Sequence, residues 1–547
     1  MSIRCLLLAL TLLAAAGSVA LAQDAPDAAA SDPIVQAMKT ELTRSMQQLR
    51  LEQAQPPYYI EYSVVDIDQF IASATFGALR NRVRIHGRAV RAVVRVGDYK
   101  QDSYEGAGQG QMELMPLDDD TLALRHQLWL ATDLAYKQAI EALTAKQAKL
   151  KQLEVETPTD DFARAPSVQM MAPLTRLEVD ENAWSKTLES ASALYREVPD
   201  VQSFDCSLQF AATNRYLVNS EGTVVRHGTT GYAVNVAASA QAPDGMHLNR
   251  GHAVNTPRQQ ELPSPDEFRA SAKKILNELQ ALRAAPLVED EYRGPVLFAA
   301  EASDSIFLRL VAPNILGRKP VPGSPARTTG EYAGSYKSRV LPDFFTVVDD
   351  PSATTAAGRS LMGAYAVDDE GVRGETITAI DKGELVAYLL GRQPIRDFPA
   401  SNGHGRAGIS PAPSPAISNL FFRSSHILSG AELRKKLVDL CAERSLAFCY
   451  RAEETGWDLG TSLLYKVWVK DGHEELVRGG VFGELDTRAL RNEIVAAGDD
   501  YKTFNVASGV PESIIAPSIL LQELQVKRST ANKQKLPVYG PPPEGGK

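Results

Sequence analysis

The chain has 547 residues, of which 44% are hydrophobic and 23% charged, and its formal net charge is −9. At roughly 100–200 residues per domain, this length predicts roughly two to four domains, each with a hydrophobic core of its own. The acidic balance argues against a general nucleic-acid-binding protein, because phosphate contacts need an excess of basic residues. Eight histidines and four cysteines are few for such a length, which limits the metal sites that the chain could form.

The first 22 residues have the pattern of a secretory signal peptide. Arg4 precedes an apolar run over 5–16, and the small residues Ala20 and Ala22 follow it. This order predicts cleavage after Ala22, whereas a membrane anchor would need about 20 apolar residues with charged flanks. No later segment is apolar over enough length to span a bilayer. We therefore expect an exported protein, periplasmic or secreted.

The N-terminal half mixes helical and strand-like patterns. Residues 23–34 are rich in alanine and aspartate and are expected to form a flexible leader, and residues 35–287 an α+β domain. Apolar residues recur at helical spacing in four segments, namely 34–52, 119–153, 181–197 and the segment after Ser264. Strand-like alternation occurs over 58–66, 70–74 and 83–96, and a hairpin is predicted over 217–225.

The C-terminal half is expected to be a strand-rich domain over residues 288–526. It begins with a short apolar strand over 292–298 and has long irregular segments rich in glycine and proline. A helix is predicted over 431–446, and residues 527–547 are expected to be a disordered tail. Helical and strand segments mix along the whole chain without an internal repeat, so the predicted fold class is α+β.

Three cysteines remain after removal of the signal peptide: Cys206, Cys441 and Cys449. Cys441 lies in the predicted helix and Cys449 in the strand that follows it. A disulfide between the two and a pair of buried thiols are both consistent with the sequence.

Most of the short motifs favour structure over chemistry. We interpret the glycine-rich run 106–110 as a mobile loop, since no Lys-Ser/Thr and no helix follow it. Ser271 and Lys274 are expected on the surface of a capped helix, and His247 and His252 in a loop instead of a metal site. The carboxylate clusters Asp349-Asp350 and Asp368-Asp369-Glu370-Gly371 could serve acid–base or cation-binding chemistry, but their positions after valine-rich strands favour turn caps.

An ordered set of segments in the second half resembles the TldD/TldE (PmbA) metallopeptidase family. The set comprises 347–351, 363–372, 381–385, 388–392 and 401–406, and the first half agrees through Tyr58-Tyr59, 95–98 and 219–222. The resemblance covers most of residues 35–527. It implies a two-domain α+β fold with mixed sheets and packed helices, which acts on extended or unfolded peptides inside a closed dimeric chamber.

The same resemblance implies that this chain lacks the metal site of the active family members. Those members bind zinc through His-Glu-x-x-x-His on a helix and a later cysteine. In this sequence Leu308 and Pro313 occupy the histidine positions and Arg309 the glutamate position. Leucine offers zinc no lone pair, and arginine is permanently charged. No histidine lies between His252 and His404, and no cysteine between residues 491 and 524.

The resemblance therefore implies a TldE-like pseudoenzyme with no catalytic residue and no metal of its own. Its partner would be a zinc-bearing TldD-type homologue, or a second copy in a dimer, and its substrate in proteolysis an extended peptide. The candidate cleft-lining residues are Asp368, Asp369, Glu370, Gly371, Asn402, His404 and Arg406. The structural alternative is that these loops only turn the chain, with Arg406 paired to a carboxylate. A second function remains open, an autonomous peptide-binding or scaffold protein without proteolysis, whereas no triad supports a peptidase with another nucleophile.

Overall fold

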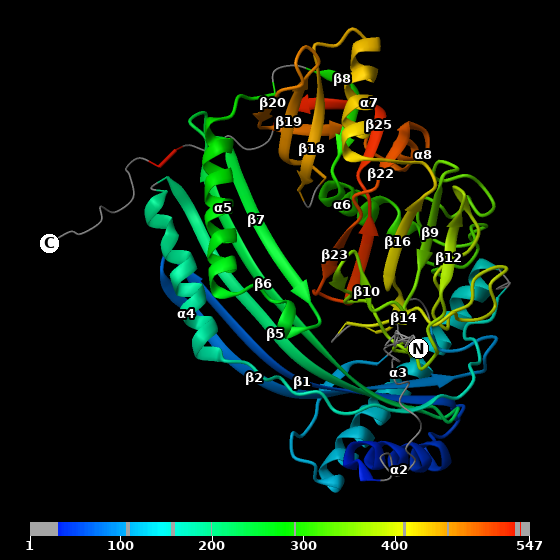
Figure 1. The fold of residues 1–547 in the computed structure, drawn as a ribbon. Helices are drawn as coiled ribbons and strands as arrows, with labels where there is room; N and C mark the ends of the chain where they lie inside the picture. Colours follow the sequence, from blue (N-terminus) through cyan, green and yellow to red (C-terminus); the bar gives the residue numbers. More distant parts are fainter. Residues whose placement is uncertain are drawn as a thin grey trace, which may run out of the picture.

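The computed structural model describes residues 31–104, 110–154, 159–198, 200–288, 291–408, 412–456, 459–530 and 536–537. The predicted signal peptide, residues 23–30 of the predicted leader, residues 106–109 of the glycine-rich run and most of the predicted tail lie outside this description. The fold is α+β, as predicted from the sequence (Figure 1). In the described part of the chain, no helix combines the length and the hydropathy that a membrane span requires.

The N-terminal half is built on one seven-stranded sheet of unusually long strands. Its strand order is β3–β2–β1–β5–β6–β4, and β7 also pairs with β6. All pairs are antiparallel except β4 with β6. The strands are β1 Pro57–Thr75, β2 Ala78–Val96, β3 Met112–Leu114, β4 Gln169–Met171, β5 Val201–Asn219, β6 Val224–Gln241 and β7 His247–Thr256.

Two expectations for these strands were wrong. The segments 58–66 and 70–74 form the single strand β1, because the charged residues where they join are paired within the sheet: Asp66 with Arg88 at 2.7 Å and Asp68 with Arg84 at 2.7 Å. The two histidines expected in a loop, His247 and His252, lie instead in β7, whose entire length pairs with β6.

Four helices cover one face of this sheet, which we call the outer face. They are α2 Pro33–Gln48, α3 Thr121–Leu153, α4 Glu181–Ser192 and α5 Pro265–Ala284. The even-numbered residues of β1 point to them: Tyr62 packs with α2 and α3, and Phe70 packs with α4 and α5. The predicted cap of α5 is confirmed, because Ser264 and Glu267 form a reciprocal capping box.

The C-terminal half contains two sheets of its own. The first has the order β13–β12–β9–β16–β24–β23, made of Glu384–Leu385, Ile377–Asp381, Phe345–Asp349, Asn419–Ser424, Glu512–Ala516 and Lys502–Val506. The second has the order β17–β22–β25–β8–β18–β19–β20 with β21 on β25, made of Ile427–Leu428, Ile494–Gly498, Ile519–Arg528, Tyr292–Phe298, Phe448–Thr455, Thr461–Trp468, Glu474–Val477 and Gly480–Gly483. Short pairs are β10 Thr355–Ala356 with β11 Arg359–Ser360, and β14 Gly405–Arg406 with β15 Ser414–Pro415.

Three helices complete this half: α6 Ala300–Leu310, α7 Gly430–Glu443 and α8 Thr487–Glu493. Helix α6 joins both sheets to one core, where the ring of Phe307 stacks on Phe422 at 4.0 Å between centroids. Helix α7 ends earlier than predicted, because Ser445 adopts a positive φ of 56°.

The alternatives for the cysteines are resolved by the fold. Cys441 on α7 and Cys449 on β18 form a disulfide, with their Cα atoms 6.2 Å apart, and Cys206 is a buried free thiol. The disulfide joins a helix to the strand that follows it, inside a small apolar cluster of its own.

The C-terminal half sits over the opposite face of the N-terminal sheet, which we call the inner face (Figure 1). The odd-numbered residues of β1, β2 and β5 point to this face, because side chains alternate along a strand. Only one part of the face is buried. We call it the covered half; it includes Glu61, Arg91, Arg95, Arg215 and Leu217. The remainder, the open half, carries exposed or half-buried side chains, namely Ile67, Gln69, Ile71, Val83, Ile85, Gln209, Ala211, Gly231, Ala233, Gly251 and Ala253.

Candidate functional site

The two loops predicted from the sequence to line a cleft meet in the structure, on the covered half of the inner face. The backbone amide of Asp369 donates to the carbonyl oxygen of Gly405 at 2.9 Å, and the amide of Gly405 donates to Asp368 at 2.8 Å. Gly405 has no room for a side chain, because a Cβ there would collide with the carboxylate of Glu370. The two loops thus form one unit.

Asp368 caps its own turn, as the sequence predicted. Its Oδ1 accepts from the amides of Glu370 at 3.0 Å and Val372 at 2.8 Å, and Gly371 completes the turn with a φ of +79°. Burial, and then the charge of Glu370, raises the pKa of Asp368 well above its ordinary value. This carboxyl group therefore has a structural position and does not face solvent.

Asp369 is shared by two arginines from different halves of the molecule. Arg215 of β5 lies 3.5 Å from Oδ1, and Nε of Arg406 lies 3.3 Å from Oδ2. Burial raises the pKa of Asp369, but the two guanidinium groups and the amide of Ala407 outweigh it, so that the pKa falls below its ordinary value. Asp369 is ionised in its buried position.

Glu370 and Glu61 bring a second pair of carboxyl groups to the same interface. Glu370 accepts from the amide of Arg392 at 2.6 Å, and Glu61 accepts from the hydroxyl of Tyr59. Burial is the main cause that raises the pKa of each. The two residues line a small chamber of about 20 Å³ with Arg95, which has room for a single water molecule.

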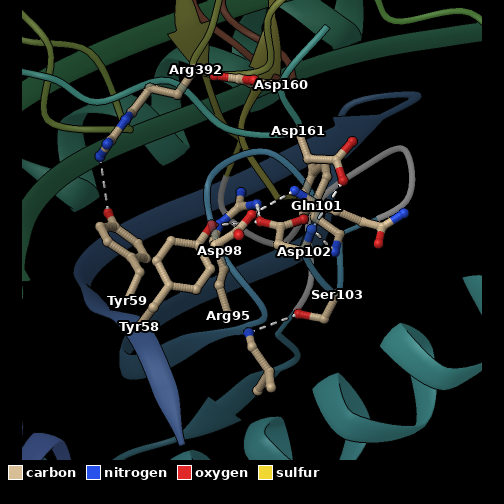
Figure 2. A network of polar contacts seen from close by, with 12 residues as sticks. Tyr58, Tyr59, Arg95, Asp98, Gln101, Asp102, Ser103, Asp160, Asp161 and Arg392 are labelled. Carbon is tan, nitrogen blue, oxygen red and sulfur yellow. Dashed lines mark hydrogen bonds and ion pairs between the residues drawn. The ribbon is translucent and has the colours of Figure 1, made fainter. Parts of the chain in front are cut away.

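Arg392 connects the C-terminal half to the N-terminal half. The residue is only 1% exposed, and its guanidinium donates to the carbonyl oxygen of Ala163 at 2.7 and 3.0 Å. It also reaches the hydroxyl of Tyr59 at 3.2 Å, as Figure 2 shows, and Glu221 at 2.6 Å. In the sequence analysis Arg392 appears only as part of a resembling segment, because nothing in its neighbourhood along the chain indicates partners more than 150 residues away.

A second polar cluster lies next to Arg392 and was not predicted (Figure 2). Asp102 accepts from Arg95 at 2.7 Å and from the hydroxyl of Tyr58 at 2.7 Å, and its amide donates to Asp161 at 3.0 Å. Two lysines then neutralise Asp161, Lys146 at 2.6 Å and Lys319 of the C-terminal half at 2.9 Å. The cluster fixes the segment that carries Ala163, the acceptor of Arg392.

An open pocket of about 590 Å³ lies above this cluster. Its walls are Tyr58, Asp98, Tyr99, Arg164, Ala165, Ser220 and Glu221. The polar groups of the wall already bind one another: Tyr99 donates to Glu221 at 2.8 Å, and Arg164 lies 3.9 Å above the ring of Tyr99. The sequence indicated parts of this wall only through the resemblance, at Tyr58, at Asp98 and at 219–222.

Asn402 and His404 are directed into the C-terminal half. Asn402 donates to the carbonyl oxygen of Tyr388 at 2.9 Å and accepts from the amide of Leu390 at 2.7 Å. Nε2 of His404 lies 3.0 Å from Asp349, which also accepts from the amide and the hydroxyl of Ser418. The expectation that Asp349 caps a turn was wrong, because its carboxylate binds Ser418 and His404 inside the core; its neighbour Asp350 does cap one, accepting from Ser352 at 2.9 Å.

This trio contains the residue types of a hydrolase triad in the wrong order. In such a triad the histidine stands between the serine and the aspartate, so that it can take the serine proton. Here Asp349 stands in the middle and accepts from both Ser418 and His404. The arrangement cannot activate the serine, and a polar core is the reading that its geometry supports.

The helix that the resemblance matches to the zinc motif does not fit a metal ion. Leu308 of α6 packs against the hydrophobic core, Arg309 brings a positive charge, and Pro313 lies beyond the helix in a 3₁₀ turn, Ala312–Ile315. In the residues that the structure describes, no three His, Cys, Asp or Glu side chains are grouped so that they could hold a metal. Neither the donors nor the charge at this place suits zinc.

The chain is similar to a known protein family in its sequence and to several solved structures in its fold. Residues 291–528 match the PmbA/TldA metallopeptidase C-terminal domain. The fold is similar to TldE from Thermococcus kodakarensis, with 12% identity over 90% of this chain and 100% of that one, at a TM-score of 0.58. It is similar to two candidate modulators of DNA gyrase. One, from Thermotoga maritima, has 16% identity over 86% of this chain and 96% of its own, at a TM-score of 0.56; the other, from Bacteroides thetaiotaomicron, has 13% identity over 90% and 98%, at a TM-score of 0.57. A search of curated proteins gives no match. The resemblance seen in the sequence and the TldE-like α+β fold are thereby confirmed.

Proposed function

Because residues 291–528 form a PmbA/TldA metallopeptidase C-terminal domain within a TldE-like fold, we propose that this protein is an exported, metal-free subunit of a peptide-processing complex. In this proposal a zinc-bearing homologue supplies the catalytic site. This chain holds an extended peptide in position for cleavage.

The observation that carries the proposal is the sequence of α6 and of the 3₁₀ turn that follows it. The domain is retained around this helix, including its packing between the two sheets through Phe307, Phe345 and Phe422. Leu308, Arg309 and Pro313 stand where the family resemblance implies that a metallopeptidase would need ligands and a base. A retained scaffold without ligands fits a subunit that depends on another chain for its chemistry.

The open half of the inner face supports the peptide-holding role. Its side chains are small or uncharged, and its border strand β7 pairs with β6 along one edge. An extended peptide can take main-chain hydrogen bonds from the other edge of β7. Small residues such as Gly251 and Ala253 let the backbone of the peptide approach. The recognition would depend little on peptide sequence.

Two features support export. The N-terminal sequence has the order of a signal peptide, and the disulfide between Cys441 and Cys449 suits an oxidising compartment. Amino-terminal sequencing of the protein isolated from its native periplasm tests this part of the proposal. We expect the mature chain to begin at Gln23, and recovery of the intact chain from the cytoplasm would contradict it.

The decisive experiment compares the chain alone with the chain co-expressed with an exported homologue that carries His-Glu-x-x-x-His. We expect no stoichiometric zinc and no cleavage of an unfolded peptide by the chain alone, and chelator-sensitive cleavage by the co-purified pair. A pair in which the motif glutamate of the homologue is changed to glutamine is the matched control and should be inactive.

Two outcomes would contradict the proposal in different ways. Stoichiometric zinc together with chelator-sensitive cleavage in the lone chain would make it a peptidase of its own. Peptide binding without any co-purifying homologue would instead favour the autonomous binding or scaffold protein.

A further inference from the structure

Arg406 and His227 lie near each other at the border between the covered and the open half of the inner face. Arg406 lies on β14 and His227 on β6, and the carboxylate of Asp369 is close to both. Along β6 the next inner-facing residues are Thr229, which is exposed, and Gly231 and Ala233, which are half-buried, with Cε of Met362 lying over Gly231. The border therefore lies where a peptide over the open half would reach the C-terminal half.

Two buried nitrogen atoms at this border have no partner in the described part of the chain: Nη1 of Arg406 and Nδ1 of His227. Arg406 is 9% exposed, and its guanidinium is held in place by the ring of Tyr365, 4.0 Å away, and by Asp369. Buried polar groups are rarely left without a hydrogen bond, and each such group calls for an explanation. A ligand that accepts hydrogen bonds from both nitrogen atoms would satisfy them.

The charges of the cluster favour an anion. Arg215 and Arg406 share the single carboxylate of Asp369, so one positive charge remains without a counter-ion within this trio. Glu512, a second carboxyl group near Arg406, balances it only in part near neutral pH, because burial and the charge of Asp349 raise its pKa to about 7. His227 does not add charge, since burial, and then the two arginines, lowers its pKa to about 4 against the opposing effect of Asp369. An anion with two oxygen atoms can accept from Nη1 of Arg406 and from a neutral imidazole N–H.

We propose that Arg406, held by Tyr365 and Asp369 and flanked by His227, is a binding subsite for the carboxylate of an extended peptide. The inference rests on the proposed peptide-holding function and adds the direction in which the peptide lies. A chain anchored here by its C-terminal carboxylate runs away from the covered half, past the exposed Thr229, toward the edge of β7. An aspartate or glutamate side chain carries the same chemical group and is the second source to be distinguished.

The test uses the full mature chain and an N-terminally fluorescein-labelled hexapeptide of alternating alanine and threonine. Three forms are compared by fluorescence anisotropy: the free acid, the C-terminal amide, and the amide with glutamate as its last residue. Because a hydrogen bond to a charged group contributes more than a neutral one, we expect the free acid to bind about tenfold or more tightly than the amide. If the glutamate form binds as tightly as the free acid, a side-chain carboxylate replaces the C-terminal carboxylate fully. If its affinity lies between those of the free acid and the amide, it replaces the C-terminal carboxylate only in part.

Arg406→Gln should reduce the affinity for the free acid to that for the amide and leave the amide unchanged. Arg406→Lys should recover only part of the difference, since lysine lacks the planar fork of arginine. Arg423→Gln is the matched control, because Arg423 is an exposed arginine on β16, away from the cluster, and should retain the full difference.

Equal binding of all three peptides to the unmodified protein would overturn the subsite and leave the peptide-holding function standing. A difference between acid and amide that persists in Arg406→Gln would also overturn it. If none of the three forms binds, the peptide-holding function fails and the subsite with it. The comparison in the unmodified protein decides the matter even if Arg406→Gln fails to fold.

Discussion

The covered and open halves of the inner face are made by the same strands and differ in what those strands carry. In the covered half β1, β2 and β5 contribute Glu61, Arg91 and Arg215. A few residues further along, β1 and β5 contribute Ile71 and Ala211 to the open half. The strand pairing is continuous through both, so the difference is one of side chains and not of backbone.

The two halves of the inner face therefore differ in their roles, one in stability and the other in ligand binding. Buried charges are costly unless each has a partner, so the covered half is stable only with the loops of the C-terminal half in place. An uncharged surface of small residues has no such requirement and remains usable by a ligand. We therefore expect substitutions in the covered half to affect stability, and substitutions in the open half to affect binding.

The largest effect is expected at Arg392. Arg392→Met removes the donors to Ala163 and the cation beside Glu221, and leaves buried acceptors without partners. Breaking one side of a buried ion pair costs about 3–5 kcal/mol. Urea unfolding should show this loss, whereas Arg423→Met on the exposed side of β16 should stay within about 0.5 kcal/mol. Equal losses in the two variants would remove the distinction between buried and exposed arginines.

Glu512, the first residue of β24, predicts a pH dependence. Burial, and then the charge of Asp349, raises its pKa to about 7 from an ordinary value of 4.5, against the opposing effect of Arg406. A raised carboxyl pKa contributes stability below pH 4.5 that is lost as the pH rises through 7, because the unfolded chain ionises first. The shift corresponds to a loss on the order of 3 kcal/mol.

Glu512→Gln should remove this loss and make the protein more stable than the unmodified chain at pH 8 but not at pH 4.5. Thermal unfolding across that range measures it, with Glu384→Gln, an exposed glutamate of β13, as the control. A variant that is less stable than the unmodified chain at pH 8 would contradict the buried position of this carboxyl group.

The disulfide lies outside both the covered and the open half of the inner face. Cys441 and Cys449 are separated by eight positions, and closing a loop of this size stabilises a protein by about 2–3 kcal/mol in the chain-entropy description. Cys441→Ser with Cys449→Ser should cost that amount in urea unfolding and leave peptide binding unchanged. Loss of peptide binding in this variant would show that the two halves of the inner face depend on the disulfide-linked helix.

The smallest change in stability is expected in the open half. Ala253→Phe on β7 places a bulky side chain on an exposed, inner-facing position and should alter the free energy of unfolding by no more than about 0.5 kcal/mol. By blocking the approach of a peptide backbone it should weaken peptide binding about tenfold, or by about 1.4 kcal/mol. Unchanged peptide affinity would argue that the peptide lies elsewhere.

The elements that the sequence predicted well depend on local patterns. The strand Tyr292–Phe298 and the capped start of α5 follow from a short apolar run and from four residues around Ser264. The turn cap by Asp368 is equally local. The polar contacts of the covered half are not local: Arg392 donates to the carbonyl oxygen of Ala163, 229 positions away, and Arg215 pairs with Asp369. A buried arginine and an exposed one look the same in a sequence, so the partners appear only in the fold.

The 229 positions between Arg392 and Ala163 have a consequence for the order of assembly. A chain made from its N-terminus has the complete long-stranded sheet available well before residue 392 emerges. During that interval Arg215 lacks Asp369, and Glu221 lacks Arg392. Formation of the sheet is thus separable from neutralisation of its charges, and the arrival of the last third of the chain is the step that commits the molecule to its final state.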